Sequence, residues 1–378
     1  MMRRILFVDD EVNILRGLRR MLRSMRREWD MSFAAGGREA LDLIAESRFD
    51  VIVSDILMPG MSGFELLTEV REIYPLTVRL VLSGTADKKE MLRSVGLIHQ
   101  YLPKPCEAEM LKSTISSLFS FAPLVESERI RKIVSKLEAV PSLPSILELF
   151  KKELGNPEPS LKALGGIVAS DIGMSAKLLQ LVHSPFLGRR RHVSGPTEAV
   201  EFAGLETMKD LAQGIGIFKS FDKETIQDLG LVPIWEHSRM VAEFARKIAR
   251  AENADPVLSD SCFIAGLLHD IGKLILAQSI PDEWRQVASQ AEQESIPLYQ
   301  VENISLGATH AHVGAWLLGL WGFEEPVVRA VAEHHQEEGI WEREFSPRVA
   351  VYAANLIAGE GSSGENFEKW RRVCMVGN

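Results

Sequence analysis

The chain has 378 residues and a formal net charge of −9, and this acidic balance argues against general binding to nucleic acids or anionic membranes. Its length predicts two or three domains. The three cysteines lie far apart and form no CxxC pair, which indicates a reducing compartment. The first apolar run is too short for a signal peptide, and no apolar stretch has the length of a membrane span. We therefore expect a cytoplasmic protein.

Residues 1–121 alternate short apolar runs with helical patterns. This alternation is typical of an α/β domain with a doubly wound parallel sheet. The pattern predicts five helices between and after the strands. The predicted strands lie near residues 4–9, 30–34, 50–55, 78–82 and 98–102.

The stretch VIVSDILMPGMSG, from Val51 to Gly63, places Asp55 at the end of an apolar strand. Reactive groups of open α/β sheets lie at the carboxyl ends of the strands. Standing alone, Asp55 would be interpreted as a loop aspartate that caps a helix. Other polar residues end or follow the neighbouring strands, namely Asp9 and Asp10, Ser83, and Lys104. Together the three acids predict an oxygen-lined site for Mg²⁺, with the Asp55 carboxylate as the nucleophile of a phosphoryl transfer.

This part of the chain resembles the receiver domain of two-component response regulators, over about residues 1–121. The resemblance implies a flavodoxin-like fold with five parallel strands, and a histidine kinase as partner. The functional positions of that family correspond to Asp9 and Asp10 as the acidic pair, Asp55 as phospho-acceptor, Ser83 as the hydroxyl, Lys104 as the lysine, and Tyr101 as the aromatic switch.

The same resemblance implies how Mg²⁺ is held. Asp10 and Asp55 would bind the ion through their side chains, and Asp9 would bind it more loosely. Leu57 would contribute its backbone carbonyl oxygen.

A helix-rich segment follows, and residues 122–138 are expected to form a helical linker between the domains. Apolar residues in this region recur at helical spacing. A helix that leaves a receiver commonly connects it to an output domain or pairs with a second copy, so we expect a homodimer. In the alternative interpretation these side chains only cover the sheet.

From about Leu137 onward the pattern is helical throughout, and residues 139–378 are expected to form an all-α domain. Six of the nine histidines lie between His237 and His335. The adjacent pair His269-Asp270 supplies one imidazole and one carboxylate, and such a mixed set suits Mn²⁺, Fe²⁺ or Zn²⁺. His310 and His312 are two residues apart, so at most one of them should face a common site on a regular helix.

This half resembles the HDOD domain, a relative of the HD phosphohydrolases, in the words VPSLPSI, AGLLHDIGKLIL, HAHVGAWLLGLWGF and AEHH. In catalytic HD enzymes the matching positions hold metal, and a lysine at the position of Lys273 faces a phosphate. The metal positions carried over to this chain are His237, His269, Asp270, His312, His334 and His335.

Two features depart from the catalytic pattern. Asn355 occupies the position of the last aspartate ligand, and a neutral amide attracts a dication less than a carboxylate does. The segment HHQEEG also lacks the GYP element of cyclic-di-GMP phosphodiesterases.

Three interpretations of the second half remain open at this point. As an HDOD output module without hydrolytic activity, it would bind an unknown protein partner under the control of Asp55 phosphorylation. Alternatively, it is a metal-dependent phosphohydrolase acting on a nucleotide or cyclic dinucleotide. In the third interpretation the histidines are only core or surface residues. We predict the first, in which phosphorylation alters receiver–HDOD packing or dimerisation.

Overall fold

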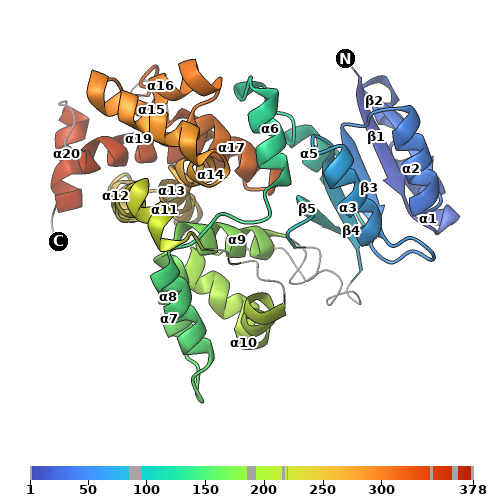
Figure 1. The fold of residues 1–378 in the computed structure, drawn as a ribbon, viewed down its shortest axis with the longest axis horizontal. Helices are drawn as coiled ribbons and strands as arrows, with labels where there is room; N and C mark the ends of the chain where they lie inside the picture. The colour runs from blue at the N-terminus through green and yellow to red at the C-terminus, as the bar shows by residue number, and fades with distance from the viewer. Residues whose placement is uncertain are drawn as a thin grey trace.

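The computed structural model describes residues 2–84, 95–184, 193–214, 218, 220–340, 344–359 and 365–375. Figure 1 shows an α/β part that contains the N-terminus beside a larger helical part that contains the C-terminus. No helix within these ranges is long and apolar enough to cross a lipid bilayer.

The α/β part is built on a parallel sheet of five strands in the order β2-β1-β3-β4-β5. This topology confirms the predicted doubly wound fold. The strands are β1 (Arg3–Val8), β2 (Trp29–Ala34), β3 (Val51–Asp55), β4 (Val78–Ser83) and β5 (Gln100–Pro103).

The helices of this part are α1 (Val12–Met21), η1 (Arg23–Arg27), α2 (Gly37–Glu46), α3 (Gly63–Ile73) and α5 (Ala108–Ser117). The helix predicted between the fourth and fifth strands falls on residues 85–94, outside the described residues. Strand β3 lies at the centre of the sheet, and its residues Val51, Ile52 and Val53 are buried. Burial on both faces explains the continuous apolar run in its sequence.

Two short elements, η2 (Ala122–Leu124) and α6 (Glu128–Lys136), lead to the helical part. Its described residues form helices, apart from an isolated bridge between Ser142 and Ser220. The helices are α7 (Pro144–Leu154), α8 (Leu161–Ala169), α9 (Ile172–His183), α10 (Pro196–Gly214), α11 (Lys223–Asp228), α12 (Val232–Ala251), α13 (Pro256–Leu268), α14 (Ile271–Ser279), α15 (Pro281–Glu294), α16 (Leu298–Leu306), α17 (His310–Leu320), α18 (Glu325–Glu333), α19 (Pro347–Ala358) and α20 (Glu365–Met375).

Helix α9 is the central helix of the first half of this domain, and all its residues from Ile172 to Val182 are buried. Its N-cap residue Asp171 accepts hydrogen bonds from the Met174 amide, the Ser142 hydroxyl and the Trp235 indole. Burial raises the pKa of Asp171, which hydrogen-bond donors partly offset. A single carboxylate therefore joins α9, α12 and the segment before α7.

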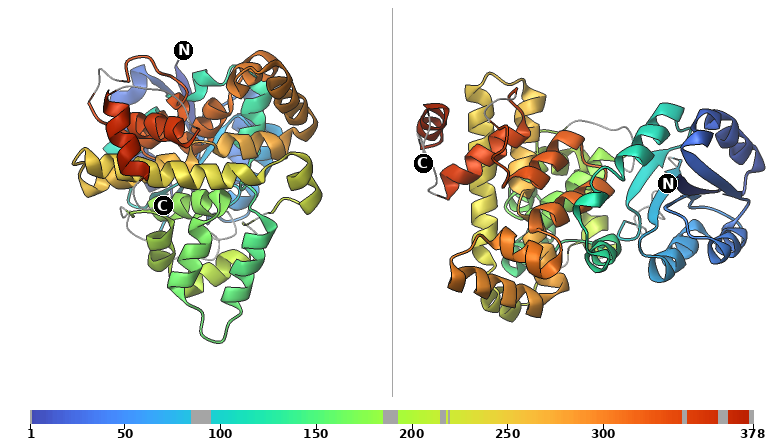
Figure 2. Two further views of the ribbon diagram at one scale, coloured as in Figure 1. Left: turned by 90° about the vertical axis from the view of Figure 1, so that its left-hand side faces the viewer. Right: turned by 90° about the horizontal axis from the view of Figure 1, so that it is seen from above.

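The two parts meet where β5 lies beside α9, as Figure 1 shows, and the right-hand view of Figure 2 shows the two parts side by side. Hydrogen bonds from Gln100 add the C-terminal end of α17 to this interface. The Gln100 Nε2 group donates hydrogen bonds to the carbonyls of Gly319 and Leu320, both at 3.2 Å. The Lys177 Nζ group of α9 donates to the Val95 carbonyl at 2.9 Å. These contacts join the segment that enters β5 to two helices of the other domain.

Further contacts extend this interface along the same segment. The Gln180 Nε2 group donates to the His99 carbonyl at 3.1 Å. The ammonium of Lys177 lies 4.8 Å from the ring centroid of Trp321, a cation–π distance. Lys177 is 1% exposed, and a cation is buried to this extent only where hydrogen-bond acceptors and aromatic faces compensate it.

The linker helix α6 is held against the sheet at the start of β4 and β5. The Arg79 Nη2 group donates to the Ser135 carbonyl at 2.6 Å, and His99 Nε2 lies 3.1 Å from the same oxygen. The Arg79 amide donates to His99 Nδ1, so the proton of a neutral His99 is on Nε2 and can reach Ser135. The Ser135 carbonyl oxygen therefore accepts hydrogen bonds from two buried side chains of the receiver. Burial lowers the pKa of Arg79 to about 9.

Burial and the nearby Arg79 hold the pKa of His99 well below its ordinary value, so the folded chain keeps this ring neutral. The unfolded chain protonates it below about pH 6.5. Acidification therefore favours the unfolded state, by up to about 1.4 kcal/mol per pH unit for this one proton. We predict that His99→Gln reduces the loss of unfolding free energy between pH 7 and pH 5 by about 2 kcal/mol.

Urea unfolding of both proteins at pH 7 and pH 5 measures this difference. The remaining histidines are common to both proteins and cancel in the comparison. Equal losses in the wild type and the variant would show that His99 is protonated in the folded chain.

Candidate functional site

The first candidate site lies at the carboxyl ends of β1 and β3. Lys104 follows β5, and its Nζ group lies 2.7 Å from Oδ2 of Asp55 and 2.8 Å from Oδ2 of Asp9. Oxygen atoms from the carboxylates of Asp9, Asp10 and Asp55 lie within 4.8 Å of one another. The parallel sheet thus brings together the three acids and the lysine that the sequence placed at separate strand ends.

Lys104 offsets part of the negative charge of this site. Burial raises the pKa of Asp55, and the hydrogen bond and charge of Lys104 partly offset that rise. Burial alone would lower the pKa of Lys104, but hydrogen bonds to Asp55 and Asp9 give it a net rise. The lysine is therefore a cation between two carboxylates, which keeps Asp55 available in its ionised form.

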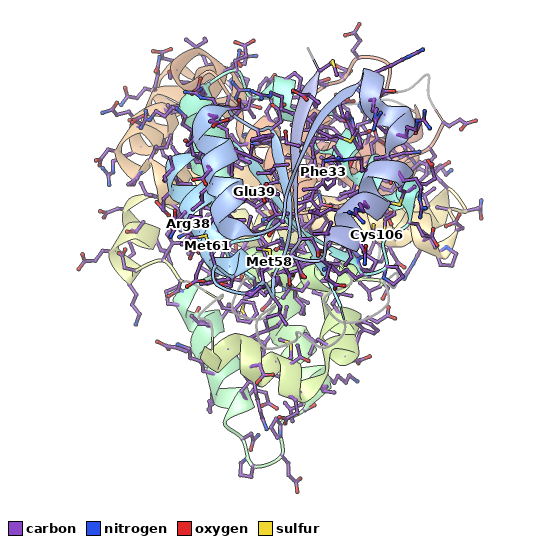
Figure 3. All side chains as sticks on the ribbon, turned by 90° about the vertical axis from the view of Figure 1, so that its right-hand side faces the viewer. Phe33, Arg38, Glu39, Met58, Met61 and Cys106 are labelled. Atoms are coloured by element: carbon purple, nitrogen blue, oxygen red, sulfur yellow. The ribbon has the colours of Figure 1, made fainter. Side chains whose placement is uncertain are left out.

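The other predicted receiver residues take different places. Leu57 follows β3 in a loop and is half exposed, whereas Tyr101 on β5 is buried. Ser83 is the last residue of β4, and its side chain lies outside the described part of the structure. Figure 3 views the receiver from the side opposite the helical domain. It shows Met58, which follows β3, and Cys106, which follows the Lys104-Pro105 peptide bond.

The loop after Asp55 depends on a close backbone approach. A Cβ atom on Gly63 would lie 1.9 Å from the carbonyl oxygen of Asp55, so only glycine fits there. The next turn is fixed by a capping box, in which Ser62 accepts from the Glu65 amide and Glu65 accepts from the Ser62 amide. Gly60 has a φ of 77°, in the left-handed region that favours glycine.

The second candidate site is a cluster of histidines where five helices meet. His269 and Asp270 connect α13 to α14, His334 and His335 follow α18, and His237 lies on α12. Two groups of ligand atoms are each within 4.8 Å of one another, His237 with His269 and Asp270, and His310 with His334 and His335.

Hydrogen bonds to backbone carbonyls fix the orientations of two rings in this cluster. The Nδ1 atoms of His269 and His334 lie 2.8 Å and 2.7 Å from the carbonyls of Gly266 and Val331. Each Nδ1 must carry the proton to make this bond, which leaves Nε2 as a lone pair. Both Nε2 atoms are buried and have no hydrogen-bond partner. The Oδ1 atom of Asp270 is also buried and without a hydrogen-bond partner. Buried acceptors of this kind are costly unless a cation or donor satisfies them.

His310, rather than the predicted His312, faces the cluster from α17. His310 Nε2 lies 2.9 Å from His335 Nε2 and 3.4 Å from Oδ1 of Asp270. His312 is partly buried elsewhere, and its Nδ1 has no partner. The expectation that only one of the two histidines faces the site is therefore correct, but the choice of His312 is wrong.

Two contacts explain why His310 takes this place. Thr309 is the N-cap of α17 and accepts from the His312 amide, which makes His310 the first helical residue. The buried carboxylate of Glu302 accepts from the His310 amide at 2.7 Å and lies 2.6 Å from its Nδ1. Glu302 was not among the predicted residues. A threonine before His310 marked the helix start, but nothing in the sequence indicated the pairing with Glu302.

The remaining polar residues complete the cluster. Lys273 donates to Oδ2 of Asp270 at 2.6 Å, and Asn355 Oδ1 lies 2.8 Å from His237 Nε2. Burial raises the pKa of Asp270, but His269 and Lys273 outweigh this and hold it well below its ordinary value. Asp270 is thus an anion at the centre of the cluster. Asn355, which stands at the position of the last aspartate metal ligand of catalytic HD enzymes, contacts His237.

Most rings of the cluster are neutral and can offer lone pairs. Burial lowers the pKa of His269 to about 4 and that of His335 to about 3. The pKa of His334 also lies well below its ordinary value because of burial. Burial lowers the pKa of His310, but the charge and hydrogen bond of Glu302, together with the hydrogen bond to Asp270, give it a net rise, so this ring is the most basic of the four.

A cavity of about 460 Å³ opens beside the cluster between α16 and α17. Its wall includes His335, whose ring stacks on Tyr299 with centroids 4.5 Å apart. His312 also lines this cavity, next to Asn303 and Gln336. The histidine that the sequence assigned to the metal site is therefore part of the wall of its neighbouring cavity.

Comparison with protein families identifies both parts of the chain. The HDOD domain model matches residues 140–337, more than half of the chain, and the response regulator receiver domain model matches residues 5–116. The chain belongs to the HDOD domain family, and a receiver domain precedes the HDOD domain. This combination is that of a two-component response regulator.

Individual relatives match parts of the chain. An uncharacterized protein of Treponema pallidum is 27% identical over 228 residues, which cover 59% of this chain and 43% of that protein. The response regulator MprA of Mycolicibacterium vanbaalenii is 35% identical over 116 residues, 30% of this chain and 49% of that protein. The match therefore spans less than half the length of either relative.

Among solved structures, the MmoQ response regulator of Methylococcus capsulatus superposes with a TM-score of 0.51. The match covers 64% of this chain and 95% of that chain, with 21% sequence identity. This similarity shows a common fold.

Because Gly63 lies against the Asp55 carbonyl, we predict that Gly63→Ala lowers the unfolding free energy by about 2 kcal/mol. The added methyl group must displace the loop that holds Asp55, so phosphoryl transfer from acetyl phosphate should slow as well. Urea unfolding and the rate of phosphorylation measure the two effects.

Gly17→Ala on helix α1 is the matched control, because no atom lies within 4 Å of its Cβ position. Alanine in a helix is favoured over glycine by about 0.5–1 kcal/mol, so this variant should be slightly more stable. A Gly63→Ala protein as stable as the Gly17→Ala protein would contradict the close approach.

Proposed function

We propose that this chain is a response regulator in which phosphorylation of Asp55 alters the packing of the receiver on a non-catalytic HDOD output module. The phosphoryl donor is a histidine kinase or a small phosphodonor. The observation that carries this proposal is that the segment from Val95 to Gln100, which leads into β5, is bonded to α9 and α17. Strand β5 runs from this segment to the reactive edge, where Pro103 pairs with Ser83.

The chemistry of transfer follows from the groups around Asp55. A carboxylate oxygen of Asp55 forms a bond to phosphorus while the bond between phosphorus and the donor's leaving atom breaks. Lys104, already 2.7 Å from Asp55, pairs with the oxygen charge of the arriving phosphoryl group. The carboxylates of Asp9, Asp10 and Asp55 suit Mg²⁺, which would neutralise the same charge when bound.

Transfer replaces one carboxylate charge with a group that carries roughly −1.5 to −2, by analogy with other phosphorylated side chains. In this proposal the hydroxyl of Ser83 at the end of β4 moves toward the phosphoryl oxygens. Ser83 pairs with Pro103 of β5, so a shift there reaches the strand that contacts the HDOD domain. Buried Tyr101, on the same strand, would respond to this shift. The expected consequences are altered domain packing or dimerisation, and altered binding of a protein partner.

We predict that Asp55→Asn abolishes labelling by radioactive acetyl phosphate, because an amide cannot act as the carboxylate nucleophile. The circular dichroism spectrum should stay unchanged, because the asparagine side chain has nearly the same size as that of aspartate. Acetyl phosphate should change hydrogen exchange in residues 95–100 of the wild type and leave the variant unaffected.

Asp42→Asn, an exposed aspartate on α2 of the same domain, should label like the wild type. Labelling of Asp55→Asn at the same site would contradict the assignment of the phospho-acceptor. Labelling of the wild type without any change in residues 95–100 would contradict the proposed output.

A second candidate function is supported by the unpaired buried atoms of the histidine cluster. His269, His334 and Asp270 each direct an unsatisfied acceptor into the site, and Glu302 supports His310 from behind. A carboxylate behind a histidine is a common arrangement at metal ligands. The residues therefore fit Mn²⁺, Fe²⁺ or Zn²⁺, held by His237, His269 and Asp270 and by His310, His334 and His335.

Such a metal would supply an activated water for a phosphohydrolase that acts on a nucleotide or cyclic dinucleotide. In this function Lys273, which lies beside Asp270, would contact a phosphate of the substrate. The neutral imidazoles would coordinate the metal ion. Asn355 replaces a carboxylate and bonds His237, so this position adds no negative charge to the centre. For this reason we place metal binding ahead of hydrolysis.

We predict that protein supplied anaerobically with Mn²⁺ and Fe²⁺ retains metal near stoichiometry, and that His334→Ala loses it because the variant removes a converging acceptor. Elemental analysis after gel filtration provides the measurement. His312→Ala is the matched control, since this histidine lies outside the cluster, and it should retain metal. Equal metal content in all three proteins, or none in any, would contradict a metal centre built from these residues.

A further inference from the structure

Helix α17 connects the receiver interface with the histidine cluster. Its first residue, His310, faces the cluster, and the carbonyls of Gly319 and Leu320 at its other end accept hydrogen bonds from Gln100 of the receiver. Eleven helical residues span about 16 Å. One element therefore contacts both the receiver and the histidine cluster.

The end of α17 at the cluster is fixed by close backbone packing. A Cβ atom on Gly272 of α14 would lie 1.9 Å from the His310 carbonyl, and one on Gly314 would lie 2.9 Å from the Ile271 side chain. Asp270 is the N-cap of the same helix α14. Helices α14 and α17 are therefore in direct backbone contact next to Asp270 and His310. A displacement of α17 relative to α14 would change the position of His310 relative to Asp270.

The other end of α17 is held by the receiver. The Gln100 side chain is 8% exposed and packs on Gly322, where a Cβ atom would lie 2.8 Å from its amide carbon. The last carbonyls of a helix lack partners within the helix, so donors from outside stabilise them, and the Gly319 carbonyl also accepts from the Gly322 amide at 3.1 Å. Gln100 supplies two such bonds from the first residue of β5, the strand that pairs with the end of β4.

We propose that α17 is a rigid link that couples the phosphorylation state of Asp55 to cation binding in the histidine cluster, and that Gln100 is its coupling residue. The inference rests on the metal centre proposed above. In the unphosphorylated structure Gln100 holds α17 while the cluster is assembled. Phosphorylation, by moving β5, weakens these bonds and lowers the affinity of the cluster for the cation.

The size of the effect follows from the bonds involved. We expect weakening of these two buried hydrogen bonds to change the affinity about tenfold, which corresponds to about 1.4 kcal/mol. Coupling between two binding sites is reciprocal, so a cation in the cluster also opposes the phosphorylated state of the receiver by the same factor.

The experiment measures Mn²⁺ affinity of the full chain by electron paramagnetic resonance, in excess Mg²⁺ to occupy the receiver. Binding that disappears in His334→Ala is assigned to the cluster. The affinity is compared with and without beryllium fluoride, which mimics the phosphoryl group on an aspartate. We expect beryllium fluoride to weaken Mn²⁺ binding of the wild type about tenfold and to leave the affinity of Gln100→Ala unchanged.

Gln180→Ala is the matched control, because it removes one amide bond of the same interface from α9 and leaves α17 untouched. It should keep the tenfold response. An equal response in Gln100→Ala would overturn the role of α17 and Gln100. Bound Mn²⁺ with no response in the wild type would overturn the coupling alone. Absence of cluster-bound Mn²⁺ in every protein would overturn the metal centre, and the coupling with it.

Discussion

The edge of the receiver sheet at β5 is the constraint on which the arrangement of the two domains depends. An edge strand leaves backbone groups without partners, and proteins cover or block such edges. Here side-chain groups from α9 bond the backbone carbonyls of Val95 and His99, and Gln100 in return bonds the end of α17. The covered segment enters β5 opposite the start of β4, and β5 then runs to the reactive end, where Pro103 pairs with Ser83. The strand that reaches the reactive end is therefore the one whose entry is held by the HDOD domain.

The two candidate sites solve the problem of buried charge in different ways. At the receiver site, Lys104 lies between the carboxylates of Asp9 and Asp55, so charges of opposite sign compensate within the site. In the histidine cluster, the backbone carbonyls behind His269 and His334 fix neutral rings whose lone pairs face inward. The first site keeps a net negative charge, because one lysine faces three carboxylates. The second has neutral acceptors left over. Both sites are therefore prepared for a cation, the first by its charge and the second by its lone pairs.

The sequence predicted those features that follow from strand ends and helix starts. Asp9, Asp55 and Lys104 end or follow parallel strands, and the topology of such sheets brings these positions together without further information. The partner of His310 could not be predicted, because the carboxylate of Glu302 reaches it through the packing of α16 on α17. For the same reason an unremarkable glutamine at position 100 gave no indication of its bonds to α17.

The carbonyl of Ser135 at the end of α6 has a consequence for how the chain is divided. It satisfies the guanidinium of Arg79 and lies within bonding distance of His99, both of which are buried inside the receiver. In energetic terms α6 is thus a piece of the receiver, although it follows the five-stranded sheet by more than twenty residues. A receiver cut off before α6 would lose one of the three backbone carbonyls that accept from the buried Arg79, and would keep those of Thr77 and Leu97. The hydrogen bonding of the receiver's buried residues is complete only when the linker helix is included.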